Sequence, residues 1–236
     1  MKLFCIPYAG GSAVIYQRWE RLLDRSIELM PVELAGRGRR IGETLYDTVE
    51  DAVNDVYGYI LKQANGKPYA IFGHSMGAMI TYYLLKKIRK EQVQAPACVF
   101  FSGRGAPHVV RHDKLKYSEM APDRFREEVI RLGGTSPEFF DIPELVEVFM
   151  PMLKNDFRLA ENAADTLAAH APLKQDIHVF IGEDDDLSTE QRDGWKDVTS
   201  GHCHFVYFKG GHFYINDHVA DLVHQINRLI RNGRPQ

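Results

Sequence analysis

The sequence contains no long apolar run. The segment from Met1 to Gly11 lacks the apolar stretch of about 7 to 15 residues that a secretory signal requires. No later segment approaches the roughly 20 consecutive apolar residues of a membrane-spanning helix. We therefore expect a cytoplasmic protein that does not associate with a membrane.

The sequence also lacks an excess of positive charge. Lysine and arginine total 29 against 32 aspartate and glutamate residues, which gives a formal net charge of -3. Proteins that bind nucleic acid usually carry a basic face or stripe. A nucleic-acid partner is therefore not expected.

Cysteine is scarce, and the spacing of Cys5, Cys98 and Cys203 fits neither a disulfide framework nor a zinc site. Each lies in an apolar segment typical of a strand, so we expect buried, reduced thiols.

His202 and His204, with the aspartates at positions 184–186, could suggest a metal site. The expected ligand set is incomplete, however, and we predict neither a metal nor another cofactor.

No internal repeat, low-complexity tract or flexible linker divides the chain. A length of 236 residues, with 44% hydrophobic and 26% charged residues, suits one globular domain. We expect a single domain over residues 1–236, with a lid inserted at about residues 105–165.

Short apolar runs alternate with helical patterns along the chain. This alternation predicts an α/β fold of the α/β-hydrolase kind, in which helices flank a mostly parallel central sheet. The predicted strands are Lys2 to Ile6, Ile27 to Leu34, Tyr69 to Phe72, Ala97 to Phe101, Ile177 to Ile181 and His204 to Phe208.

Two predicted helices have clear end signals. Apolar residues recur at helical spacing from Val49 to Leu61, after Asp47-Thr48, which supplies an N-cap, and with Glu50 placed to complete a capping box. A last helix is predicted from Val219 to Ile230, and Asn232 with Gly233 would end it.

The region from about residue 105 to 165 contains no convincing strand. Apolar residues recur there at helical spacing at Phe125, Val129 and Leu132, and again from Phe139 to Leu153. The pattern predicts a helical lid over the sheet. We expect the inner face of this lid, and not a deep polar pocket, to set substrate tolerance.

The segment Gly73-His74-Ser75-Met76-Gly77 lies between a predicted strand and a predicted helix. In a Gly-x-Ser-x-Gly elbow the serine occupies a tight, strained turn, and a side chain at either glycine would collide with the neighbouring strand or helix. The motif alone is common, but the strand before it and the helix after it favour Ser75 as a nucleophile. A simple helix N-cap would explain the serine and not both glycines.

A serine nucleophile needs a histidine base that is oriented by an acid. In this fold the order along the chain is serine, acid, histidine, each just past the end of a strand. His212 follows the strand-like segment Phe205 to Phe208 on a turn with Gly210 and Gly211, and none of the other histidines is placed in this way. His212 is the predicted base.

The predicted acid lies directly after the strand Ile177 to Ile181, where three aspartates follow one another. We favour Asp185 because it follows Gly182 with two residues between them, as is usual for such turns, and Asp184 is the alternative. The preceding strand ends in the segment 102–104, Ser-Gly-Arg, which offers no carboxylate.

Acyl transfer also requires hydrogen-bond donors for the oxyanion of the tetrahedral intermediate. One donor is expected to be the backbone amide of Met76, which follows the nucleophile. The second is expected from the glycine-rich loop after the first strand, at the amide of Ala9. A phosphate-binding loop would be followed by Lys-Ser or Lys-Thr or would contain Gly-x-Gly-x-x-Gly. This loop has neither, so nucleotide binding is not predicted.

Taken together, these residues resemble the type II thioesterases of nonribosomal peptide and polyketide biosynthesis, which are free-standing editing enzymes. The likeness extends over nearly the whole chain, and the pairing of Pro-Tyr-Ala-Gly-Gly with Gly-His-Ser-Met-Gly is far more specific than the elbow alone. The segments that resemble the family are Phe4 to Ser12, Gly36 to Arg40, Gly73 to Gly77, Ser102 to Pro107, Leu132 to Gly134 and Gly210 to Phe213.

The resemblance implies a triad of Ser75, Asp185 and His212 with oxyanion amides at Ala9 and Met76. It also implies a lid that controls access for a 4′-phosphopantetheine arm delivered by an acyl or peptidyl carrier protein. We expect this carrier to bind transiently and the enzyme to be a monomer. Two departures occur: residue 35 is alanine where proline is common, and residues 153–157, Leu-Lys-Asn-Asp-Phe, vary a Leu-Arg-Ala-Asp-Phe pattern of the lid.

Two other functions compete with this hypothesis. The chain could be a carboxylesterase that acts on small free esters, or a binding protein that keeps the hydrolase scaffold without catalysis. A complete triad would argue against the second.

Overall fold

The computed structural model describes residues 1–109, 116–163 and 172–232. Within these ranges six strands form one sheet in the order β2-β1-β3-β4-β5-β6, and every neighbouring pair is parallel. This confirms the predicted sheet. The strands are β1 (Lys2–Ile6), β2 (Glu28–Pro31), β3 (Tyr69–His74), β4 (Cys98–Ser102), β5 (Ile177–Gly182) and β6 (Cys203–Phe208).

The predicted strands agree with the observed ones to within two residues at most ends. The exception is β2, which stops at Pro31 and not at Leu34 as predicted. β2 lies at the edge of the sheet and pairs with β1 alone. This pairing ends where Cys5 faces Pro31, so residues 32–34 are not part of the ladder. The inner strands β1, β3, β4 and β5 are almost wholly buried, because helices cover both faces of the sheet.

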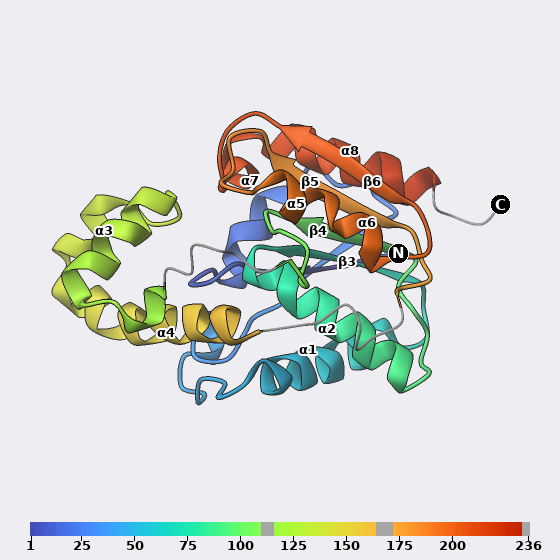
Figure 1. The fold of residues 1–236 in the computed structure, drawn as a ribbon. Helices are drawn as coiled ribbons and strands as arrows, with labels where there is room; N and C mark the ends of the chain where they lie inside the picture. Colours follow the sequence, from blue (N-terminus) through green and yellow to red (C-terminus); the bar gives the residue numbers. More distant parts are fainter. Residues whose placement is uncertain (110–115, 164–171, 233–236) are drawn as a thin grey trace.

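Helices cover the sheet on two sides (Figure 1). The first apolar core packs α1 (Val49–Ala64), α2 (Met76–Lys90) and α6 (Trp195–Val198) against one face. The second core packs η1 (Ala13–Trp19), α7 (Tyr214–Asp217) and α8 (Val219–Asn232) against the other. Short segments η2 (Gly38–Arg40) and α5 (Thr189–Asp193) complete this part of the chain.

The start of α1 has Thr48, the second residue of the predicted Asp47-Thr48 pair, as its N-cap, and it corrects the capping box. The Thr48 hydroxyl accepts a hydrogen bond from the amide of Asp51, and the Asp51 carboxylate accepts one from the amide of Thr48. Glu50, the predicted partner, stands one position too early, since the box requires the third residue after the N-cap. At the end of α8, Gly233 lies outside the described residues.

The region predicted as a lid forms helices that project to one side of the sheet (Figure 1, left). It contains η3 (Tyr117–Glu119), α3 (Pro122–Leu132), η4 (Pro137–Asp141) and α4 (Pro143–Asn162). These helices share a small core of their own around Phe125, Val129 and Leu153. Residues 110–115 and 164–165 of the predicted lid lie outside the described residues. We use the word lid below for residues 116–163.

The three cysteines lie in β1, β4 and β6, and all are free thiols. Cys5 and Cys98 are buried, whereas Cys203 on the edge strand is only partly buried. Burial raises the pKa of Cys98 and of Cys203 to about 11, so both are thiols near neutral pH. The prediction of reduced thiols holds, although burial of Cys203 is incomplete.

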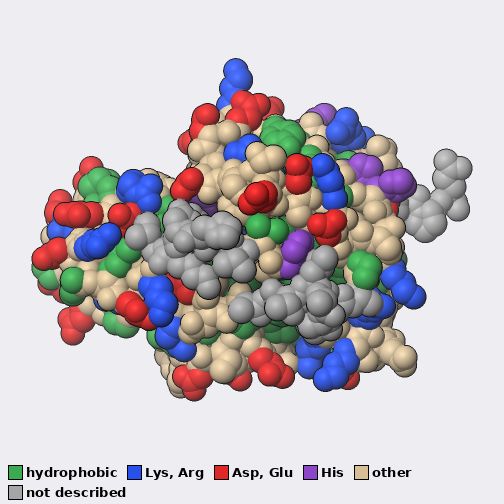
Figure 2. Space-filling view, viewed as in Figure 1, with side chains coloured by type: hydrophobic (Ala, Val, Ile, Leu, Met, Phe, Trp, Pro, Cys, Tyr) green, Lys and Arg blue, Asp and Glu red, His purple; other side chains and the backbone are tan. Residues whose placement is uncertain are grey.

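Within the described ranges, we find no helix with the length and apolar character needed to span a bilayer. On the face shown in Figure 2, acidic and basic side chains alternate, and neither sign forms a continuous field. This agrees with the near balance of charges in the sequence.

Three histidine rings lie close together at β5, at β6 and at the residue before β6. The ring of His178 lies 5.3 Å from that of His204 and 5.2 Å from Phe100, and His202 lies 5.8 Å from His204, between centroids. In the part of the chain described, no group of three or more histidine, cysteine or acidic side chains could hold a metal ion. Burial, reinforced by the neighbouring His204, lowers the pKa of His178 to about 4.

We predict that His178 makes the protein less stable in mild acid. The unfolded chain takes up a proton at this histidine near pH 6.5, about 2.5 units above the folded pKa, so the free energy of unfolding falls as the pH falls from about 6.5 to about 4. The loss reaches about 2 kcal/mol by about pH 5. Urea unfolding of wild type and His178→Gln at several pH values measures it. Equal pH dependence of the two proteins would show that the histidine contributes nothing.

Candidate active site

Ser75 occupies a sharp turn between β3 and α2. Its backbone angles, φ 54° and ψ -111°, lie outside the regions that a non-glycine residue normally adopts. A Cβ atom at Gly73 would come within 2.2 Å of the Gly77 carbonyl oxygen, and one at Gly77 within 2.2 Å of the Ile6 carbonyl oxygen. Both glycines are therefore required by close backbone packing, as the elbow motif predicts.

The structure brings Ser75, His212 and Asp185 together. The His212 Nε2 atom lies 3.0 Å from the Ser75 hydroxyl, and its Nδ1 atom lies 3.1 and 3.2 Å from the two carboxylate oxygens of Asp185. All three distances are within hydrogen-bond reach. With Nδ1 protonated and held by the carboxylate, Nε2 is free to accept the serine proton.

The geometry favours Asp185 over the other two aspartates of this turn. Asp185 is 7% exposed, whereas Asp184 and Asp186 are exposed to solvent. The acid-bearing turn and the histidine-bearing turn are joined by backbone hydrogen bonds, among them Asp184 N–H to the Gly210 carbonyl at 3.0 Å. A Cβ atom at Gly182 would come within 2.4 Å of the Gly211 carbonyl oxygen, so a glycine there allows the two turns to approach.

The two predicted oxyanion donors lie on adjacent segments. Met76 is the first residue of α2, and a first helical amide has no partner within its own helix. Ala9 lies in the loop after β1, and this loop passes beside the elbow, since a Cβ at Gly77 would also meet the Pro7 carbonyl oxygen at 2.8 Å. The amide of Gly11 donates to the Tyr8 carbonyl at 2.9 Å and closes a turn around Ala9.

A buried polar chain lies behind the histidine. His74 is fully buried, its Nδ1 atom lies 2.8 Å from the Ser102 hydroxyl, and this hydroxyl also contacts the Tyr214 hydroxyl. Burial holds the pKa of His74 well below its ordinary value, and the nearby His212 adds to this effect. The His74 ring, 5.2 Å from that of His212 between centroids, therefore stays neutral and does not repel an imidazolium formed at His212.

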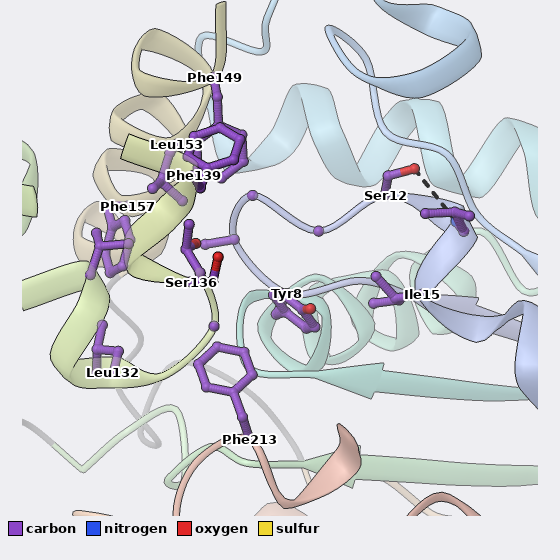
Figure 3. A pocket seen from close by; sticks show the side chains of 17 residues that line it. Tyr8, Ser12, Ile15, Leu132, Ser136, Phe139, Phe149, Leu153, Phe157 and Phe213 are labelled. Carbon is purple, nitrogen blue, oxygen red and sulfur yellow. Dashed lines mark hydrogen bonds between the residues drawn. The ribbon is translucent and has the colours of Figure 1, made fainter. Parts of the chain in front are cut away.

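A cavity of about 340 Å³ lies between the lid and the loop after β1. Figure 3 shows aromatic and aliphatic side chains of the lid on one side, with Tyr8 and Ile15 on the other and Phe213 below. Ala9, with its predicted oxyanion amide, and Phe213, next to His212, both line the cavity. The apolar lid side chains that line it are Val129, Leu132, Phe139, Phe149, Leu153 and Phe157, and the polar Thr135 and Ser136 of the lid line it as well.

The lid stripe predicted from Phe139 to Leu153 is thus only partly an inner face. Phe139, Phe149 and Leu153 line the cavity, but Ile142 and Leu145 are each 45% exposed. Apolar spacing showed that a helix was present. It did not show which turn of the helix would face the body of the protein.

Sequence reasoning missed a second set of buried charges close to the predicted site. Glu33, at 8% exposure, accepts a hydrogen bond from the amide of Ala13 at 2.9 Å. Arg37 and Asp156, at 3% and 1% exposure, form an ion pair next to the same loop. Both members of this pair lie in segments noted for family resemblance. Nothing in the sequence indicated that residues 119 positions apart would meet.

A parallel sheet that presents a serine elbow, a histidine and a buried carboxylate on neighbouring turns has the architecture of an α/β-hydrolase. The model of the Thioesterase domain family matches residues 1–230. The chain belongs to this family, whose members are hydrolases that act on thioesters.

Relatives and solved structures agree with this assignment. The medium-chain S-acyl fatty acid synthase thioesterase of Rattus norvegicus is 31% identical over 218 residues, which are 91% of this chain and 81% of the relative. The structure of ClbQ from the colibactin NRPS/PKS pathway is 35% identical, with a TM-score of 0.91 and coverage of 98% and 97% of the two chains. YbtT, a type II thioesterase from the yersiniabactin NRPS/PKS pathway, is 27% identical, with a TM-score of 0.86 and coverage of 98% and 93%.

Proposed function

We propose that this protein is a free-standing editing thioesterase that removes acyl or aminoacyl groups from the 4′-phosphopantetheine arms of carrier proteins in nonribosomal peptide or polyketide synthesis. The observation that carries the proposal is the Ser75–His212–Asp185 contact beside an apolar cavity. It is supported by the similarity to ClbQ and YbtT over nearly the whole length of each chain.

The proposed reaction begins with the Ser75 hydroxyl. Its oxygen attacks the thioester carbonyl carbon while its proton passes to His212 Nε2, 3.0 Å away. The carbonyl oxygen becomes an oxyanion, which the amides of Ala9 and Met76 stabilise. The carbon–sulfur bond then breaks, the sulfur takes a proton from His212, and the acyl group remains as an ester on Ser75.

Water completes the cycle. His212 removes a proton from a water molecule that attacks the acyl-serine ester, and the same histidine returns a proton to the departing serine oxygen. Asp185 stabilises the imidazolium in both halves of the reaction. A thiol has a pKa of about 8.5 and leaves far more easily than an alkoxide, so the thioester needs little acid assistance from His212.

The cavity suits the hydrocarbon part of an acyl group. Its lining is largely aromatic and aliphatic, and a volume of about 340 Å³ is near the lower end of ordinary ligand pockets. Substrate preference would then depend on how lid side chains such as Phe139 and Phe149 limit this space.

We expect a transient carrier partner and no cofactor on the enzyme itself.

A second candidate is the release of medium-chain fatty acyl groups from a fatty acid synthase carrier. It is favoured by the 31% identity to the rat enzyme whose name states that activity. Both candidates use the same triad and the same type of thioester, so acyl preference separates them.

We predict higher kcat/KM for carrier-bound thioesters than for simple oxygen esters of the same acyl group. The test loads a stand-alone carrier protein with acetyl, propionyl, aminoacyl and decanoyl groups and measures hydrolysis of each. Preference for the short and aminoacyl groups supports editing, whereas a strong preference for decanoyl supports medium-chain release. A preference for free oxygen esters would make the protein a carboxylesterase and overturn the proposal.

A further inference from the structure

A buried ion pair connects the lid to the body of the protein beside the predicted oxyanion loop. Arg37 precedes η2, and Asp156 lies on α4 of the lid. The guanidinium binds the carboxylate through two contacts, Nη1 to Oδ2 at 2.6 Å and Nη2 to Oδ1 at 2.8 Å. The side chains are only 3% and 1% exposed, so both charges are buried away from bulk solvent.

Both charged groups also hold the backbone of the loop after β1. The amide of Gly10 donates to Asp156 Oδ2 at 2.7 Å, and Arg37 Nη1 donates to the Gly11 carbonyl at 3.2 Å. Charge-assisted hydrogen bonds of this kind are roughly twice as strong as neutral ones. The residue just before these two glycines is Ala9, whose amide is a predicted oxyanion donor.

The hydrogen bond to Gly10 selects one of two conformations of this turn. The turn from Tyr8 to Gly11 is closed by the Gly11 N–H bond to the Tyr8 carbonyl, and Gly10 has φ +78°. A positive φ at the third residue is typical of a type II turn, which differs from type I by a flip of the central peptide. That flip would replace the Gly10 N–H facing Asp156 by the Ala9 carbonyl oxygen, which the carboxylate repels.

The same contacts fix the direction of the Ala9 amide. In a trans peptide the N–H of Ala9 points opposite to the carbonyl of Tyr8. The Gly11 amide donates to the Tyr8 carbonyl, and Arg37 donates to the Gly11 carbonyl. These bonds fix the plane of the peptide between Tyr8 and Ala9. The direction of the Ala9 N–H therefore depends on the buried ion pair. Leu153 and Phe149 of the same lid helix also pack on Gly10, where a Cβ would meet them at 2.7 and 2.9 Å.

We propose that Asp156, together with Arg37, is a positioning residue that aims the Ala9 amide at the oxyanion. Buried ion pairs are often no more stabilising than apolar side chains of similar size, so stability alone gives little reason for this pair. The proposal rests on the proposed function for its substrate, but one of its two measurements does not require that substrate. It also makes the lid helix a part of the oxyanion site, because Asp156 lies on that helix.

The test compares Asp156→Asn with Asn155→Ala. The neighbouring Asn155 ties the same helix to the body through the Tyr46 carbonyl at 3.1 Å and does not bond to the loop after β1. We expect Asp156→Asn to lower kcat by about 10- to 100-fold with KM changed less than about 3-fold, since a misaimed donor costs less than the 10²- to 10³-fold of a lost one. Asn155→Ala should keep both constants.

A second readout does not depend on the natural substrate. A fluorophosphonate that labels Ser75 forms a tetrahedral adduct whose oxygen needs the same amides, so its labelling rate should fall by the same factor in Asp156→Asn and stay unchanged in Asn155→Ala. If wild type is labelled at Ser75 but hydrolyses no carrier thioester, the proposed function fails while the positioning role is still measured.

Arg37→Lys covers the case in which Asp156→Asn does not fold. Lysine keeps the positive charge but cannot bind the carboxylate with two nitrogens while holding the Gly11 carbonyl in the same way. We expect a folded protein whose kcat and labelling rate fall by about 3- to 10-fold. Wild-type labelling rates in the folded variants, or an equal loss in Asn155→Ala, would overturn the proposal and leave the pair a purely structural contact.

Discussion

Replacing Ser75 by alanine is expected to lower kcat for thioester hydrolysis by about 10⁴-fold or more and to abolish acyl-enzyme formation. The hydroxyl is the only group on the elbow turn that lies within hydrogen-bond reach of His212 Nε2 among the described residues. Without it, hydrolysis would depend on direct attack by water, helped only by the oxyanion amides. Steady-state turnover of an acyl carrier protein, with intact-protein mass spectrometry, measures both effects.

The matched control is Ser200→Ala, which removes a hydroxyl at an exposed position outside the site. It should retain wild-type turnover and wild-type labelling by a fluorophosphonate. Folding of Ser75→Ala is checked by its unfolding midpoint, which should not fall, because the strained turn does not depend on the hydroxyl. A Ser75→Ala protein with substantial turnover would remove the serine from the mechanism.

Replacing Asp185 by asparagine is expected to lower kcat by up to about 10⁴-fold. An asparagine amide can turn its NH₂ group toward His212 Nδ1, which favours the tautomer with the proton on Nε2. That tautomer points an N–H at Ser75 and cannot accept the serine proton. The variant should fold, because asparagine has nearly the same shape as aspartate.

Asp184→Asn is the matched control for this prediction. Asp184 precedes the acid in the same turn, but its side chain is exposed, whereas that of Asp185 is buried against the histidine. We expect Asp184→Asn to change kcat less than about 3-fold, as surface substitutions away from special contacts usually have small effects. A larger loss of kcat in Asp184→Asn than in Asp185→Asn would show that Asp184, and not Asp185, is the acid of the triad.

Much of the fold could be predicted from the sequence because parallel strands covered on both faces are almost wholly apolar. Each predicted strand therefore overlaps an observed one, and the elbow glycines follow from backbone contacts that any side chain would break. At the start of α1, a single position decided the outcome. The pair Asp47-Thr48 predicts an N-cap without deciding between its two residues, and Glu50 is the wrong box partner because Thr48 is the cap and Asp51 is the third residue after it.

The tertiary contacts that complete the site could not be predicted in the same way. Sequence order restricted the acid to three adjacent aspartates, but burial against His212 distinguishes Asp185 from its neighbours. The pairing of Arg37 with Asp156 has no local signal at all, because each residue looks like an ordinary surface charge in its own segment. Contacts between distant charges become visible only when the lid is placed on the body.

The most direct test of the account is to find where the acyl group goes. Wild-type protein is mixed with a carrier protein that bears an acyl thioester, quenched within the first turnover, digested and examined by mass spectrometry. The account predicts the mass of the acyl group on the peptide that contains Ser75, and its absence from Ser75→Ala. Full turnover with no acylated peptide, or with the acyl group on another residue, would contradict it.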